Sequence, residues 1–138
     1  MATLTYTKFN PFCEAVAEKK HNLGSDQLVV ALTNTAPNAT DATLSQLTQI
    51  SYTNLSSRNL TTTSSSQTGG TYSLVLQDLT LTASGGSVAP FRYIVIYNDT
   101  ASNDELISYY DIGSSVTLQD GESYLLDFSQ SQTLLEIA

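Results

Sequence analysis

The sequence has little of several residue types, and each shortage excludes a class of protein. One cysteine, Cys13, excludes a disulfide within the chain, and no apolar run reaches the roughly 18 residues of a membrane-spanning helix. Only five residues are basic, and Lys19-Lys20 is the one basic pair, whereas binding to nucleic-acid phosphates needs clustered Lys and Arg. The start, MATLTYTKFN, lacks the charged and apolar regions of a secretory signal. We therefore expect a protein made in a cytosol, with neither nucleic acid nor a membrane among its partners.

Hydroxyl side chains and acidic charge take the place of what is missing. The chain holds 19 Thr and 18 Ser, while charged residues are only 13%. Hydrophobic residues make up 41%, enough for one buried core, and the net charge of −8 keeps a crowded or repeated assembly soluble. Thr suits the exposed face of a β-sheet. This composition predicts a single β-rich domain that covers residues 1–138.

One segment has the periodicity of a helix, residues 10–23 approximately, NPFCEAVAEKKHNL. Asn10 is placed to cap its start, and Gly24 can supply a left-handed stop. The last turn would then carry three residues that complement the helix dipole: Lys19, Lys20 and His21.

The rest of the sequence has the period of strands. Strands are expected at residues 4–7, 27–34, 49–55, 71–84, 91–98, 105–112 and 133–137. The alternation over 71–84 changes phase near Asp78, which predicts a bulge. The continuous apolar run of FRYIVIYN, residues 91–98, predicts a central strand that is covered on both faces. Residues 41–48 are expected to form one helical turn, and TTTSSSQTGG, residues 61–70, a polar loop.

The segment SVTLQDGESYLLDF, residues 115–128, has the pattern of a hairpin. A two-residue turn would pair Val116 with Leu125, whereas a three-residue loop with Gly121 left-handed pairs Val116 with Tyr124. We favour the second because it keeps the apolar side chains on one face. Short strands at this spacing indicate a sandwich or a barrel. We predict an all-β fold, a jelly-roll-like β-sandwich of about eight or nine strands with one short N-terminal helix.

Few groups suit catalysis or metal binding. His21 is the only histidine, and on the expected helix it lies about two turns from Cys13, beyond hydrogen-bond reach. Three acidic residues, Asp99, Asp104 and Glu105, could hold a calcium ion, but their spacing fits no EF-hand, and a solvated loop is favoured. We expect no cofactor, no metal and no enzymatic activity.

Tyrosine is the most informative residue type. Tyr93 and Tyr97 alternate with isoleucines along one expected strand, and the adjacent Tyr109 and Tyr110 must point to opposite faces of another. Tyrosines suit interfaces because they combine a large area with a polar tip. These four residues are candidates for a subunit interface, and ordinary half-exposed tyrosines are the alternative.

Several segments resemble a family of small virion proteins of tailed bacteriophages, including cyanophages. The similar stretches are LVVALTNTAPN (28–38), GGTYSLVLQDLTLTASGGSVAPFRYIVIYNDT (69–100), VTLQDGESYLLDF (116–128) and the helical segment KFNPFCEAVAEKKHNLG (8–24). The resemblance implies a β-sandwich that forms homotrimers and binds the major capsid protein on the outer capsid surface of the virion, as a cement or decoration protein. It implies no catalytic residues.

Two other functions stay open. The first is a receptor- or carbohydrate-binding module of a tail fibre or tailspike, in which exposed tyrosines contact a host surface glycan. The second is a small glycosidase with paired carboxylates, for which the sequence offers no positive sign. If the protein is a cement, we expect Lys8, Lys19 and Lys20 to meet the capsid, and the alternative is a helix that only closes one end of the sandwich.

Overall fold

The computed structural model describes residues 5–128 and 135–137, and antiparallel strands dominate it, which confirms the all-β prediction. The strands are β1 (Thr5–Lys8), β2 (Leu28–Thr33), β3 (Thr62–Thr68), β4 (Thr71–Leu76), β5 (Leu79–Thr82), β6 (Phe91–Asn98), β7 (Leu106–Val116), β8 (Ser123–Leu126) and β9 (Leu135–Ile137). The helical pieces are α1 (Phe12–Ala17) and the 3-10 turn η1 (Leu44–Gln46). None of the helices in the described part of the chain combines the length and apolar character needed to cross a bilayer.

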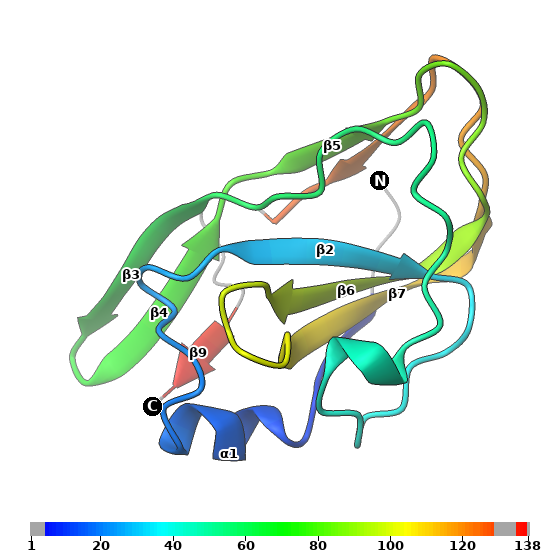
Figure 1. The fold of residues 1–138 in the computed structure, drawn as a ribbon. Helices are drawn as coiled ribbons and strands as arrows, with labels where there is room; N and C mark the ends of the chain where they lie inside the picture. Colours follow the sequence, from blue (N-terminus) through cyan, green and yellow to red (C-terminus); the bar gives the residue numbers. More distant parts are fainter. Residues whose placement is uncertain (1–4, 129–134, 138) are drawn as a thin grey trace.

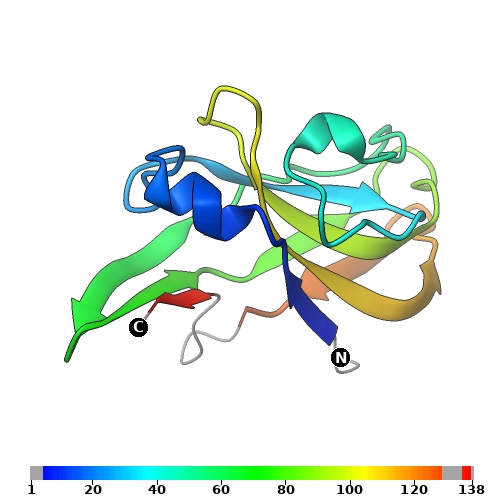
Figure 2. The same ribbon diagram turned by 90° about the horizontal axis from the view of Figure 1, so that it is seen from below.

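The strands form three sheets on two levels. The largest sheet has the order β1-β7-β6-β2, and the smaller ones are β3-β4-β9 and β5-β8 (Figure 1). Figure 2 shows the large sheet between η1 on one side and β4 and β8 on the other. The second level is thus divided into two separate sheets, and the specific jelly-roll sandwich stays a prediction.

Strand β6 is buried on both faces, as the continuous apolar run predicted. Ile94 and Ile96 point into the main core, which also contains the buried leucines of β4, β5 and β8. Val95 and Tyr97 point the other way, into a second cluster that Phe9 completes. Removing a large side chain from a core of this kind costs roughly 2–5 kcal/mol, so both faces of the sheet contribute to stability.

Helix α1 is shorter than the predicted segment 10–23. It spans Phe12–Ala17, its N-cap residue is Pro11 in place of the predicted Asn10, and no side chain accepts a capping hydrogen bond there. The chain turns at Lys19, whose φ is 67°, and the N–H of Lys20 reaches back to the carbonyl of Ala15 at 2.8 Å. Lys19, Lys20 and His21 therefore lie beyond the helix, and Gly24 is not its stop. The loop leaves the helix early because Leu23 is buried in the main core.

The predicted polar loop at residues 61–70 is wrong. Residues Thr62–Thr68 form β3, which pairs with β4 across a two-residue turn at Gly69-Gly70. The polar composition indicated a loop. The segment is nevertheless a strand, because its backbone forms a ladder of hydrogen bonds with β4. Thr also favours extended structure.

The predicted hairpin of residues 115–128 is also wrong in its pairing. Gly121 has a positive φ of 87° as expected, and the N–H of Glu122 bonds to the carbonyl of Gln119. However, β8 pairs with β5, and Val116 at the end of β7 pairs with Phe91 of β6. The two arms therefore enter different sheets: Val116 pairs with the buried Phe91, and Tyr124 pairs with the buried Leu81.

The segment 49–55 is not the predicted strand, although it lies beside one. Ile50 donates its N–H to the carbonyl of Leu32, and the hydroxyl of Tyr52 accepts the N–H of Leu32. The segment 49–55 therefore covers the free edge of β2 through individual hydrogen bonds, without forming a strand ladder. The predicted helical turn in 41–48 is confirmed by η1. The predicted single strand 71–84 with a bulge near Asp78 is wrong: the chain breaks there, so that β4 and β5 are separate strands in different sheets.

Candidate functional site

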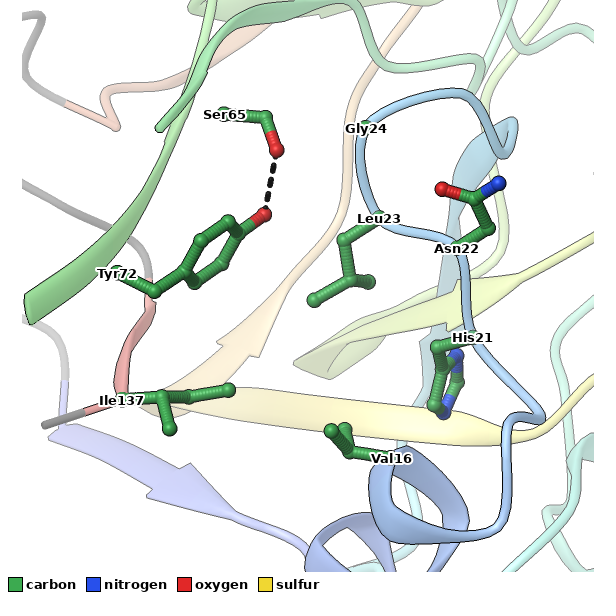
Figure 3. A pocket seen from close by; sticks show the side chains of 8 residues that line it. All are labelled: Val16, His21, Asn22, Leu23, Gly24, Ser65, Tyr72 and Ile137. Atoms are coloured by element: carbon green, nitrogen blue, oxygen red, sulfur yellow. Dashed lines mark hydrogen bonds between the residues drawn. The ribbon is translucent and has the colours of Figure 1, made fainter. Parts of the chain in front are cut away.

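A groove opens where the loop after α1 meets the β3–β4 hairpin and β9. It has a volume of about 360 Å³, and its walls combine apolar Val16, Leu23 and Ile137 with polar side chains. Figure 3 shows Tyr72 and Ser65 on one wall and Asn22 and His21 on the other. The hydroxyls of Tyr72 and Ser65 are 2.7 Å apart, so the tyrosine ring is held in place. The volume falls in the range of small-ligand sites, and an aromatic ring beside amide and hydroxyl groups suits a polar ligand such as a sugar.

A buried polar network lies behind this groove and is centred on Asn98, which is fully buried. Its Oδ1 accepts the backbone N–H groups of Thr100 and Ala101, which fixes the orientation of the amide. Its Nδ2 therefore donates, at 2.6 Å to Oδ2 of Asp26 and at 2.9 Å to Nδ1 of His21. The network ties the loop after α1 to the end of β6.

The state of His21 follows from these contacts. Because Nδ1 accepts from Asn98, the neutral ring carries its proton on Nε2. Burial lowers the pKa of His21, and the carboxylates of Glu105 and Asp26 offset part of that shift. The ring also packs on Phe12, with 5.1 Å between centroids. These contacts keep His21 neutral near pH 7.

Glu105 lies in the same region and is 7% exposed. Its Oε2, like Nε2 of His21, is buried and forms no hydrogen bond with the described part of the protein. Its main chain joins the network, since the N–H of Asn98 bonds to the carbonyl of Glu105. Cys13 is exposed, and its Sγ lies 3.1 Å from Nζ of Lys8.

The three acidic residues that could have held a calcium ion, Asp99, Asp104 and Glu105, are not gathered into a metal site in the described part of the chain. Within residues 5–128 and 135–137, no group of three His, Cys, Asp or Glu side chains is arranged to hold a metal ion. The pKa of Asp104 is raised by burial and by the neighbouring charges of Asp99 and Glu105. These carboxylates therefore repel one another on a loop.

The four predicted interface tyrosines are largely used within the chain. Tyr93 and Tyr97 are buried, and Tyr109 packs against Phe9 on the same face of the large sheet. Tyr110 points to the main core and contacts Phe128, and burial raises its pKa. Little of these side chains is left for a partner, and their role in a subunit interface stays a prediction.

The three predicted capsid-contact lysines are all exposed and flank α1. Lys8 ends β1, and Lys19 and Lys20 follow the helix. Three of the five basic residues of the chain thus surround this helix, together with the acidic Glu14 and Glu18. The rest of the chain carries the acidic excess.

Sequence reasoning missed the groove and the network around Asn98. The groove is formed by loops and a hairpin that are distant in sequence, so no local pattern marks it. One signal was available: Asn98 ends the apolar run 91–98 and is followed by Asp99-Thr100, and Asn in that position commonly bonds to the N–H two residues on.

No family model, curated protein or solved structure matches the chain.

Proposed function

We propose that the protein is a non-enzymatic structural component of a phage virion, a trimeric cement protein that binds the outer capsid surface and stabilises the mature head. The proposal draws on the resemblance of residues 28–38, 69–100 and 116–128 to small virion proteins. In the structure these stretches form most of β2, β4, β5, β6 and the β7–β8 region, so the resemblance concerns the core strands.

The observation that carries the proposal is the uneven charge. Lys8, Lys19 and Lys20 are exposed around α1, whereas the protein as a whole has a net charge of −8. An acidic lattice would attract this end and repel the others, which orients the protein as it binds. A protein that binds only the mature lattice stabilises it by mass action, and three linked contacts add avidity.

The test is charge reversal of Lys19 and Lys20. The variant with Lys19→Glu and Lys20→Glu is expected to keep the oligomeric state of the parent in light scattering and to lose binding to expanded heads in co-sedimentation. Arg92→Glu, also a reversal of a basic residue but a half-buried one that pairs with Asp111 at 2.8 Å, serves as the control and is expected to bind. Undiminished head binding by the double variant, or a protein that is monomeric at all concentrations, would contradict the proposal.

A second candidate function rests on the groove. Tyr72 with Ser65, Asn22 and His21 offers an aromatic face and polar groups to a glycan of a host surface, as in a module of a tail fibre or tailspike. A glycan array in which the parent protein binds and Tyr72→Ala does not would favour this function. Tyr72→Phe keeps the ring and loses the bond to Ser65, so it separates stacking from hydrogen bonding.

A further inference from the structure

Strand β3 is an open sheet edge within the part of the chain that the structure describes. The sheet order β3-β4-β9 places it at the border, and no other strand of the described chain lies beside it. Six of its seven residues are exposed, and the hairpin extends away from the body in both views (Figures 1 and 2). Proteins commonly block such edges with charged side chains or proline. The sequence of β3, TTSSSQT, has neither, although a bulge interrupts its start between Thr62 and Ser64.

The register of the hairpin shows which backbone groups are free. Gly69-Gly70 is a two-residue turn, so the flanking Thr68 and Thr71 form a hydrogen-bonded pair. Alternate residues then turn their N–H and C=O toward β4, and the residues between them turn outward. Ser65 and Gln67 are the outward pair, and each offers one donor and one acceptor at the edge of the sheet.

Charge decides which partner suits this edge. Residues 61–77, which include the whole hairpin, contain no Asp, Glu, Lys or Arg, whereas the whole chain has a net charge of −8. Two copies of an acidic protein repel each other over most of their surfaces, and least where both are neutral. The hairpin is such a neutral surface, and it projects far enough for two bodies to approach.

We propose that β3 pairs with β3 of a second copy of this chain in antiparallel orientation, across a two-fold axis at Ser66. This register places Ser65 opposite Gln67 of the other copy on both sides of the axis, and all four outward residues form backbone hydrogen bonds. Ser66 then meets Ser66 of the other copy, and Ser64 meets Thr68, and such hydroxyl pairs are favourable across strands. The result is one continuous sheet with the order β9-β4-β3-β3-β4-β9.

A two-fold contact of this kind differs from the three-fold contact of the proposed trimer. One consequence of the pairing rests on the proposed function: in a decorated head, the hairpins would link one trimer to the next. The pairing itself is a property of the free protein, and it can hold or fail whether or not the protein binds a capsid.

Cysteine cross-linking tests the register directly. In a Cys13→Ser background, Ser66→Cys places two thiols at a non-hydrogen-bonded pair, where the Cα atoms lie about 4.5 Å apart and a disulfide can form. It is expected to form disulfide dimers at least roughly tenfold faster under air oxidation than Ser102→Cys, an exposed loop position. Equal rates for the two variants would overturn the proposal.

Two further variants check that the pairing is antiparallel. Ser64→Cys or Thr68→Cys alone should cross-link slowly, because the symmetric thiols are four residues, about 13 Å, out of register. A mixture of the two variants should cross-link rapidly, because position 64 faces position 68. Fast cross-linking of either one alone, or no gain in the mixture, would contradict this register.

A proline variant tests the backbone bonds. Gln67→Pro removes an outward N–H that no strand of the described chain uses, and Gln67→Ala is the matched control, since both lose the side-chain bond to the N–H of Gly70. In sedimentation analysis, the dissociation constant of self-association should be at least about tenfold higher for Gln67→Pro than for Gln67→Ala. Equal dissociation constants for the two variants would overturn the proposal. A proline variant that self-associates normally but no longer binds heads would also overturn it, because β3 would then pair with a strand of the capsid protein.

Discussion

At the scale of single residues, Asn98 does more for the structure than any other polar side chain described above. Its amide joins the end of β6 to the following loop and to the loop after α1, through four hydrogen bonds of 2.6–3.1 Å. A buried amide that satisfies its donors and acceptors in this way stabilises the fold, whereas an unsatisfied one costs roughly 1–3 kcal/mol. The groove wall formed by His21 and Asn22 therefore depends on a residue that does not line the groove.

The first prediction concerns pH and follows from His21. Burial lowers its pKa below the ordinary value of 6.5, so the folded state prefers the neutral ring, and Nδ1 must stay unprotonated to accept from Asn98. The unfolded chain binds the extra proton first, so this contribution to stability is complete above pH 6.5 and is lost as the pH falls below it. Urea unfolding should show a midpoint that decreases from pH 7.5 to pH 5.5.

His21→Gln is the control for this prediction, because its side chain can still accept from Asn98 but does not titrate. Its unfolding midpoint should change much less over the same interval. Asp111, whose pKa is lowered by its hydrogen bond with Arg92, affects a separate and more acidic window, below about pH 4. An equal loss of stability in His21→Gln would show that another group is responsible.

At the scale of elements, the β3–β4 hairpin depends on its turn. Gly69 and Gly70 have φ values of 59° and 88°, and a Cβ at either position meets no atom within 4 Å. Substitutions there change backbone strain and not packing. A β-branched residue is poorly suited to positive φ, whereas Asn tolerates it and is common at the first position of such turns.

The second prediction uses this difference. Gly70→Val should destabilise the protein by about 1–2 kcal/mol, whereas Gly69→Asn should be close to neutral. The free energies of unfolding in urea measure both. If Gly70→Val is as stable as Gly69→Asn, the turn does not have the geometry described here.

At the scale of the whole molecule, the protein is built around one sheet with two apolar faces. The main core lies between this sheet and the two smaller ones, and the second cluster lies on the opposite face, where Leu44 and Leu47 of the η1 region and Phe9 cover Val95. Strand β6 lies between β7 and β2, so it has neighbours on both edges and both faces. Strand β3 has one paired edge and almost no buried residue.

The third prediction is a gradient of hydrogen exchange. Amides of Ile94 and Ile96 in β6 should exchange only through global unfolding, whereas the outward amides of Ser65 and Gln67 should exchange almost as fast as in an unfolded chain. Exchange measured by NMR at low protein concentration checks this, and a higher concentration should slow the two β3 amides alone if β3 pairs with a second copy. Strong protection of Ser65 and Gln67 at low concentration would mean that their edge is covered within one chain.

Local pattern was enough to predict part of this fold. Strands β2 and β6 and the turn η1 were all predicted, because each depends on the burial of near neighbours in sequence. The polar groove wall was not, because Asn98 and His21 are 77 residues apart and meet only in the folded chain.

The sequence by itself determined the all-β class, the double-sided burial of residues 91–98 and the scarcity of reactive groups, because side-chain period and composition act locally. The tertiary structure alone decided that TTSSSQT extends as an edge strand, that β8 pairs with β5 and not with β7, and that the helix stops at Ala17. Those outcomes depend on which buried surfaces and backbone partners compete for a segment, and the competing partners lie far away along the chain.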